Sequence, residues 1–151
     1  MTISLIDFEQ ADVQALLRHH LSEAGQGAVT HALDTSALQT PDLTMFSLRD
    51  DDGALMGFAA LKALSASDGE IKSVRTHPDH LRKGVSRRLM DHLEAEGRTR
   101  GYKRLLLETH PTEAYAAARA LYLRRGYTYR GPFGEYAESP ESVFMELLLG
   151  D

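Results

Sequence analysis

Residues 70–90 read Glu-Ile-Lys-Ser-Val-Arg-Thr-His-Pro-Asp-His-Leu-Arg-Lys-Gly-Val-Ser-Arg-Arg-Leu-Met, a strand pattern that passes through a basic loop into a helix pattern. The N–H groups of a helix's first turn have no intrahelical acceptor and carry a partial positive charge. Gly84 has no Cβ, so an anion can approach the main chain there, and Arg82, Lys83 and Arg87 add positive charge. The stretch therefore predicts a phosphate site at the start of the helix. The alternative is an ordinary strand–helix connection with a solvated basic loop.

Two common nucleotide-binding motifs do not occur in this stretch. It lacks the Gly-Lys-Ser/Thr end of a Walker A loop, and it lacks the three spaced glycines of a dinucleotide fingerprint. The sequence therefore predicts neither a P-loop site nor a doubly wound dinucleotide fold.

Length, charge and cysteine content exclude several classes of protein. The 151 residues suffice for one domain, and we expect residues 1–151 to form it. The 17 basic and 22 acidic residues give a net charge of −5, which argues against binding to nucleic acid, although basic residues are concentrated between Arg75 and Arg104. The absence of cysteine excludes disulfides, cysteine-based zinc sites and a cysteine nucleophile. No apolar run approaches the ~20 residues of a membrane helix, and the first residues do not resemble a secretory signal, so we expect a cytoplasmic protein without membrane contact.

Hydrophobic periodicity predicts the elements on both sides of this stretch. The expected strands are Thr2–Ile6, Leu43–Arg49, Leu55–Leu64, Glu70–Thr76, Arg104–Thr109, Tyr127–Arg130 and Ser142–Leu149. The first expected helix has its N-cap at Asp7, with Gln10 as the capping-box partner, and ends at Gly25 and Gly27. The other expected helices run near His31 to Leu38, from Gly84 to Gly97–Gly101, and from Pro111 to Gly126. A strand–helix–strand unit over residues 70–109 makes one pair of strands parallel. The expected fold class is therefore α/β: a mixed, mostly antiparallel central sheet with a parallel central pair, flanked by helices.

Two segments carry a resemblance to a known family. Residues 74–86, Val-Arg-Thr-His-Pro-Asp-His-Leu-Arg-Lys-Gly-Val-Ser, resemble the coenzyme A loop of the GNAT N-acetyltransferase superfamily, whose pattern after a strand and before a helix is Arg/Gln-x-x-Gly-x-Gly/Ala. Residues 120–127, Ala-Leu-Tyr-Leu-Arg-Arg-Gly-Tyr, resemble the family's Leu-Tyr-x-x-x-Gly-Phe/Tyr segment. The expected order of strands and helices agrees with the family along essentially the whole chain.

The sequence departs from the family pattern at three places. Leu81 stands at the usual Arg/Gln position, with Arg82 one place later, and Ser86 replaces Gly or Ala. Because main-chain amides supply most of the phosphate contacts, these two changes weaken the resemblance little. Residues 108–110, Glu-Thr-His, stand where the family commonly has an asparagine, which leaves the contacts to the middle of the cofactor open.

The resemblance implies an enzyme with the GNAT, or acyl-CoA N-acyltransferase, fold. Such an N-acetyltransferase moves an acetyl group from acetyl-CoA, its co-substrate, to a primary amine that attacks the thioester directly, without a metal and without a covalent intermediate. A small-molecule amine is the favoured acceptor, and a homodimer is the expected assembly. The alternative is a non-catalytic module that binds or senses acyl-CoA.

The resemblance also assigns residues to the cofactor. The main chain of residues 74–76 is expected to pair with the pantetheine arm as an added β-strand would, and the loop and the helix start are expected to hold the phosphates. The expected cofactor-binding residues are Val74, Arg75, Thr76, Arg82, Lys83, Gly84, Val85, Ser86 and Arg87.

Tyr122 and Glu70 are the expected catalytic residues. Tyr122 matches the family tyrosine near the thioester sulfur, and a phenol with a pKa of about 10 can donate a proton to a thiolate; without the resemblance it is a packed helix tyrosine. Glu70 opens the strand where several family members carry a glutamate base, which acts directly or through water. The alternative for Glu70 is a solvent-facing charge at the strand edge. His110, at the end of the next strand, is the rival base. Its alternative is a structural or surface histidine.

The turn-rich residues 130–140 are the expected acceptor-binding loop. Here two aromatic residues, Phe133 and Tyr136, alternate with two acids, a combination that suits a cationic amine. The alternative is a hairpin loop with solvated acids. We therefore expect His110, Phe133 and Tyr136 to contact the acceptor.

Overall fold

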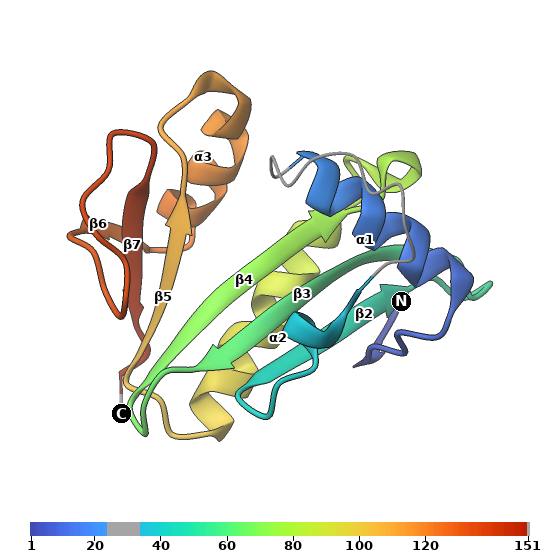
Figure 1. The fold of residues 1–151 in the computed structure, drawn as a ribbon, viewed down its shortest axis with the longest axis horizontal. Coiled ribbons are helices and arrows are strands. Elements are labelled where there is room, and N and C mark those ends of the chain that lie inside the picture. Colours follow the sequence, from blue (N-terminus) through green and yellow to red (C-terminus); the bar gives the residue numbers. More distant parts are fainter. Residues whose placement is uncertain (24–33, 151) are drawn as a thin grey trace. The chain divides into compact units, whose positions relative to one another are not determined.

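The computed structural model describes residues 1–23 and 34–150 (Figure 1). The strands are β1 (Thr2–Leu5), β2 (Leu43–Arg49), β3 (Leu55–Ala63), β4 (Asp68–Thr76), β5 (Arg104–Thr109), β6 (Thr128–Arg130) and β7 (Val143–Leu148). The helices are α1 (Ala11–Glu23), α2 (Val85–Thr99) and α3 (Ala116–Arg124), and the 3₁₀ turns are Ser36–Leu38, Pro78–His80 and Glu113–Tyr115. None of these described helices combines the length and the apolarity needed to cross a membrane. The helix end expected at Gly25 and Gly27, and the helix start expected near His31, lie outside the described residues.

The strands form a mixed sheet in the order β1-β2-β3-β4-β5-β7-β6. β4 and β5 are parallel, with Asp68 opposite Arg104 and Ile71 opposite Leu107. β1 pairs antiparallel with β2, and β7 pairs antiparallel with both β5 and β6. The expected fold class is therefore confirmed.

The chain divides into two compact units. The first contains the described residues of the ranges 1–60 and 73–92, and the second contains those of 61–72 and 93–151. β3, β4 and α2 contribute residues to both. Each unit has its own apolar cluster, which draws side chains from distant parts of the sequence.

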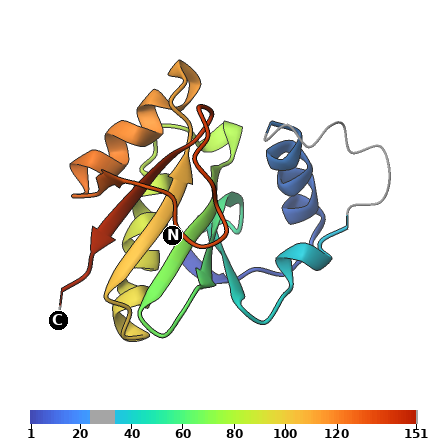
Figure 2. The same ribbon diagram turned by 60° about the vertical axis from the view of Figure 1, so that its left-hand side comes forward.

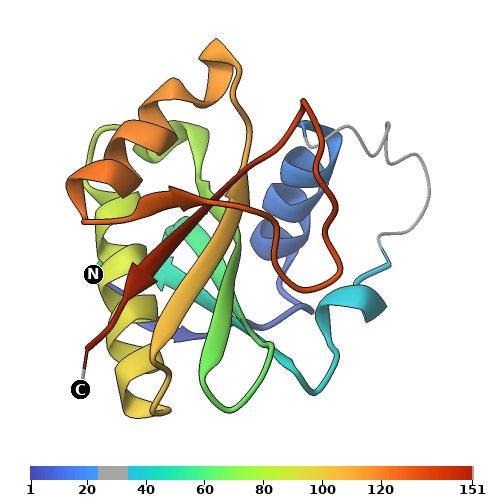
Figure 3. The same cartoon turned by 90° about the vertical axis from the view of Figure 1, so that its left-hand side faces the viewer.

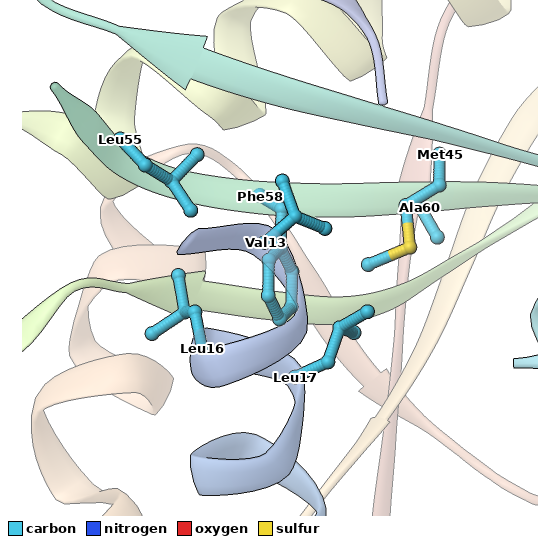
Figure 4. Packing of buried hydrophobic residues seen from close by; sticks show 7 residues of the cluster. All are labelled: Val13, Leu16, Leu17, Met45, Leu55, Phe58 and Ala60. Atoms are coloured by element: carbon cyan, nitrogen blue, oxygen red, sulfur yellow. The ribbon is translucent and has the colours of Figure 1, made fainter. Parts of the chain in front are cut away.

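The first unit is built around α1, which packs on β2 and β3. Three apolar residues of α1 follow one helix face at helical spacing, and their partners come from the two strands (Figure 4). The cluster consists of Val13, Leu16, Leu17, Met45, Leu55, Phe58 and Ala60, all less than 5% exposed. Burying one leucine side chain contributes roughly 1.5–3 kcal/mol, so this cluster holds α1 firmly on the strands.

The opposite face of β3 holds the start of α2. Successive side chains of a strand point to opposite faces, so Gly57 faces away from Phe58 and from α1. A Cβ at Gly57 would collide with the Arg75 carbonyl of β4 and with the side chain of Val85, the first residue of α2. The close packing requires glycine at this position, and it fixes where α2 begins.

The second unit is built around β5. Leu105, Leu106 and Leu107 are each at most 2% exposed, which confirms the expected strand covered on both faces. On one face Gly97 of α2 lies against Leu105, and α3 lies on the same side (Figure 2). On the other face Leu106 packs with Phe133, in the loop that joins β6 to β7 (Figure 3).

The first helix begins later than the capping pattern predicts. The Asp7 carboxylate accepts a hydrogen bond from the Glu9 N–H at 2.9 Å, and the Asp7 carbonyl accepts one from the Gln10 N–H at 3.3 Å. Asp7 therefore forms a turn of its own, and α1 starts at Ala11 instead of directly after Asp7.

Two other expected helices contain 3₁₀ turns in their described parts. Of the helix expected to end at Leu38, the described part is the 3₁₀ turn Ser36–Leu38. The helix expected after Pro111 begins at Ala116, because Glu113–Tyr115 form a 3₁₀ turn first.

Candidate functional site

The predicted phosphate loop leads from the 3₁₀ turn Pro78–His80 into α2. Gly84 has a φ of +76° and Arg82 a φ of +64°, so left-handed residues flank Lys83. A Cβ at Gly84 would meet no atom within 4 Å, which means that the space beside this glycine is open. The Arg88 N–H donates to the Gly84 carbonyl at 3.0 Å, so the N–H groups of the helix start before Arg88 have no intrahelical acceptor.

Three cations belong to this loop and the first turn of α2. Arg82, Lys83 and Arg87 are exposed, whereas Val85 is buried and anchors the helix start. Main-chain donors, open space at Gly84 and three cations together suit a small polyanion.

Side-chain hydrogen bonds hold the shape of the loop. Thr76 Oγ1 and Ser86 Oγ lie 2.9 Å apart and join the end of β4 to the first turn of α2. The Asp79 N–H donates to His77 Nδ1 at 3.0 Å. The structure thus brings Thr76 and Ser86, two of the predicted cofactor residues, into direct contact.

The predicted pantetheine-binding segment is the last part of β4. The register with β5 ends at Ile71, and Ser73 follows with a φ of +56°. Residues 74–76 are half-buried. The Arg75 side chain donates from Nε to His20 Nδ1 of α1 at 2.9 Å. No sequence pattern predicts this contact, because a histidine on a helix does not specify its partner.

Glu70 lies on β4 in the second unit and is only 3% exposed. Its Oε2 accepts a hydrogen bond from the Tyr136 hydroxyl at 2.6 Å. The Tyr136 ring packs against Phe133 and Phe144, with centroid distances of 5.1 and 5.4 Å. The alternative of a solvent-facing charge at Glu70 is therefore wrong, and both predicted loop aromatics belong to the cluster around this carboxylate.

A second carboxylate lies on the same face of the sheet. Glu70 is opposite Leu106 in the parallel register, so Glu108 lies two residues further along β5 on that face. The Ser142 hydroxyl donates to Glu108 Oε2 at 2.6 Å. Burial raises the pKa of Tyr136, and Glu70 and Glu108 raise it further, so this phenol keeps its proton at neutral pH.

His110 follows β5 and makes separate contacts. Its Nδ1 lies 2.7 Å from the Glu141 carbonyl. Because a carbonyl can only accept, Nδ1 carries the proton, and Nε2 is the lone-pair nitrogen of the neutral ring. The His110 ring also packs against Tyr115 at a centroid distance of 4.4 Å. His110 can act as a base through Nε2, and both Glu70 and His110 stay predicted candidates for the base.

Tyr122 is the one buried residue of α3, at 9% exposure. Burial raises the pKa of its phenol. The centroid of the Tyr122 ring lies 5.8 Å from that of the Tyr127 ring. Within the part of the chain that the structure describes, the Tyr122 hydroxyl makes no hydrogen bond. A protonated phenol without an internal acceptor can give its proton to a substrate.

A buried ion pair fixes the end of α3. Arg125 donates from Nε and Nη2 to Glu94 of α2 at 2.8 and 2.9 Å, and the Tyr127 hydroxyl donates to the same carboxylate at 3.1 Å. Sequence reasoning missed this group. Its signal is the position of Glu94 beside Met90 and Leu93 on the apolar side of a helix, since a buried acid needs a partner.

Comparisons with known proteins agree with this architecture. Residues 13–127 match the model of the acetyltransferase (GNAT) family. The uncharacterized N-acetyltransferase YsnE of Bacillus subtilis is 40% identical over 148 residues, which are 96% of this chain and 97% of YsnE. A solved Klebsiella pneumoniae structure, provisionally described as an acyl-CoA N-acyltransferase, is 31% identical, has a TM-score of 0.77, and is matched over 98% of this chain and 97% of its own. An aminoglycoside 6′-N-acetyltransferase solved with coenzyme A has the same fold at 16% identity, with a TM-score of 0.74 over 99% of this chain and 97% of that one.

These matches confirm the family, the fold and the class of enzyme, an N-acetyltransferase, that the resemblance predicts. Because the family model spans residues 13–127 and YsnE matches nearly the whole sequence, the chain belongs to the acetyltransferase (GNAT) family.

Proposed function

We propose that the chain transfers an acetyl group from acetyl-CoA to the primary amine of a small molecule. The observation that carries this proposal is the start of α2. Open space at Gly84, unpaired main-chain donors and the cations Arg82, Lys83 and Arg87 suit the pyrophosphate of coenzyme A there. Membership of the family supports the same ligand.

Two further features fit the co-substrate. Residues 74–76 follow the end of the register with β5, and their main-chain groups are our candidates for contacts with the pantetheine arm. The contact between Thr76 and Ser86 keeps the loop in shape. The buried Val85 contributes through its main-chain N–H, since its side chain packs inside the protein.

The proposed chemistry divides the proton transfers between two buried groups. Acetyl-CoA supplies the thioester that the amine attacks. Glu70 accepts a proton from the amine at a carboxylate oxygen. Tyr122 keeps its proton, because burial raises its pKa, and gives that proton to the departing thiolate. A raised pKa also makes the phenol a weaker acid, so we expect its proton to move only as the C–S bond breaks and the sulfur gains charge.

His110 is the second candidate for the base, favoured by its lone-pair Nε2. Parallel measurements of Glu70→Gln and His110→Gln separate the two candidates. The base is the residue whose substitution lowers kcat without changing the affinity for acetyl-CoA, because such a group acts on the amine and not on the co-substrate.

The proposed acceptor is a cationic small-molecule amine. Its support is the cluster in the second unit, where the rings of Phe133 and Tyr136 lie beside the carboxylates Glu70 and Glu108. Aromatic faces and carboxylates both attract ammonium groups.

The decisive experiment measures the release of free coenzyme A from acetyl-CoA with a panel of amines, which includes polyamines, amino acids, aminoglycosides and peptides. Turnover with a small amine supports the proposal. Tight binding of acetyl-CoA without turnover across the panel favours the non-catalytic binding module instead, and turnover with peptides alone overturns the small-molecule acceptor.

We propose that residues 1–151 form a single catalytic domain, as their number predicts, and that this domain works in the cytoplasm. From the resemblance we also propose that it forms a homodimer. Light scattering coupled to size-exclusion chromatography tests the assembly, because a monomeric mass contradicts the dimer.

A further inference from the structure

Tyr136 and Glu70 meet across 66 residues of sequence. Tyr136 belongs to residues 131–142, the loop between β6 and β7 (Figure 3), and Glu70 belongs to β4. The tyrosine hydroxyl and the carboxylate oxygen Oε2 are 2.6 Å apart, the short distance of a hydrogen bond to a charged acceptor.

Two phenylalanine rings, Phe133 of the loop and Phe144 of β7, pack against the Tyr136 ring. The ring centroids of Phe133 and Phe144 lie 5.1 and 5.4 Å from the Tyr136 centroid and 5.7 Å from each other. The Tyr136 N–H also donates to the Phe133 carbonyl at 3.1 Å. These contacts fix the direction in which the hydroxyl points.

A buried carboxylate needs a hydrogen-bond donor, and Tyr136 supplies one to Glu70. Burying an unpaired charge is unfavourable, whereas a hydroxyl that donates to a carboxylate stabilises its charged form. Oε2 receives this bond, and in the described ranges of the chain no donor contacts Oε1.

The other charged groups on this face of the described strands make no hydrogen bond to Glu70. From β3 to β7 they are Lys62, Asp68, Lys72, Arg104, Glu108, Arg130 and Glu146. Arg104 Nε lies 3.1 Å from Asp68 Oδ1, and Arg104 Nη1 lies 3.8 Å from Glu146 Oε2. Glu108 accepts from Ser142. Among the described residues, Tyr136 is the side chain that donates a hydrogen bond to Glu70.

We infer that Tyr136 is a positioning residue, which holds Glu70 as a charged carboxylate and leaves Oε1 to accept the proton of the amine. This inference rests on the proposed role of Glu70 as the base. It differs from the role predicted by the sequence, in which Tyr136 contacts the acceptor itself. Tyr136 can keep donating this bond because burial and Glu70 raise its own pKa.

The test is Tyr136→Phe, which removes one hydroxyl and keeps the packed ring. We expect kcat with a known amine acceptor to fall by about tenfold or more, the worth of a hydrogen bond to a charged group. The acid limb of the kcat–pH profile should move to higher pH, because the charged form of the base loses its donor. KM for acetyl-CoA should stay the same. Tyr129→Phe is the matched control, since Tyr129 is 53% exposed on β6, and it should leave kcat and the profile unchanged.

A double-mutant cycle makes the inference specific. In a Glu70→Gln background, Tyr136→Phe should cause no further loss of kcat, because the two residues act as one unit. A Tyr136→Phe enzyme that raises only the KM for the amine, with kcat and the acid limb unchanged, overturns positioning in favour of acceptor contact. A wild-type kcat in Glu70→Gln overturns the proposed base, and the inference with it. A slow Glu70→Gln beside a fully active Tyr136→Phe overturns the inference alone.

Folding is checked by the thermal midpoint of each variant. If Tyr136→Phe does not fold, Phe133→Leu replaces it, because this variant keeps the hydroxyl but loosens the ring that supports it. It must then move the acid limb in the same direction by a smaller amount, and an unmoved limb contradicts the inference.

Discussion

The start of α2 and the Glu70–Tyr136 pair differ in the groups they offer a ligand: the first offers main-chain groups and the second offers side chains. The loop before α2 is exposed and leads to main-chain N–H groups beside a glycine with open space. Glu70 is buried, and its chemistry depends on one side-chain hydroxyl at 2.6 Å. A site made of main chain is sensitive to what is added to it, whereas a site made of buried side chains is sensitive to the loss of a single atom.

The largest expected effect comes from adding a side chain and a negative charge at Gly84. Gly84→Glu should weaken coenzyme A binding by on the order of 10²–10⁴-fold, because it fills the approach to the main chain and removes two or more charge-assisted hydrogen bonds. Isothermal titration calorimetry with coenzyme A measures this loss.

Gly53→Glu is the matched control for this substitution. Gly53 has a φ of +86°, and a Cβ there also meets no atom within 4 Å, so both variants carry a similar left-handed strain. Gly53→Glu should bind coenzyme A normally. Equal affinities in the two folded variants would remove the phosphate site from the start of α2.

The loss of a single oxygen at Tyr122 should have the next largest effect. Tyr122→Phe keeps the buried ring of α3 but deletes the proposed proton donor, so we expect a decrease on the order of a hundredfold in the single-turnover rate at saturating acetyl-CoA. Coenzyme A affinity should not change. Identical single-turnover rates in wild type and variant would make Tyr122 a packing residue, and Tyr129→Phe controls for the loss of an exposed phenol.

The smallest effect is a change in stability at high pH, which distinguishes the two regions by their phenols. Residues 77–87 contain no tyrosine, whereas burial, followed by Glu94, raises the pKa of Tyr127 in the second unit. Above the unfolded value of about 10, the folded protein holds this proton and the unfolded chain has lost it, so the free energy of unfolding falls as pH rises. Below pH 10 the contribution is fully present.

Tyr127→Phe should make this alkaline loss shallower. One buried phenol contributes up to about 1.4 kcal/mol of lost stability per pH unit in this range. Urea unfolding followed by circular dichroism between pH 8 and 11 measures the slope. A slope equal to that of wild type would show that Tyr127 titrates as it does in the unfolded chain.

The fold could be predicted wherever the pattern of one segment was sufficient. The hydrophobic pattern of residues 43–49 and the apolar run at residues 104–109 predicted the bounds of β2 and β5 correctly. The start of α1 could not be predicted, because Asp7 has two local uses, a helix cap and a turn, and the turn formed.

The candidate site was predictable to the degree that it is contiguous. The loop at residues 82–87 is visible in the sequence because glycine, cations and helix start follow one another. The hydrogen bond between Tyr136 and Glu70 was not predictable, since its partners come from a strand and a distant loop, and only tertiary packing brings them together.

The Glu94–Arg125 pair has a consequence for the helix that carries Tyr122. α3 is rich in alanine, and Tyr122 is its only buried side chain. Because its alanine side chains are alike, packing alone gives the helix little preference for one rotation about its axis. A slip of one residue would turn the helix by about 100° and point the phenol elsewhere. The Arg125 guanidinium donates from two nitrogens to the Glu94 carboxylate in a single geometry, which selects one register. The main effect of the ion pair is therefore on structural specificity: it selects which of several nearly equivalent positions of α3 is the native one.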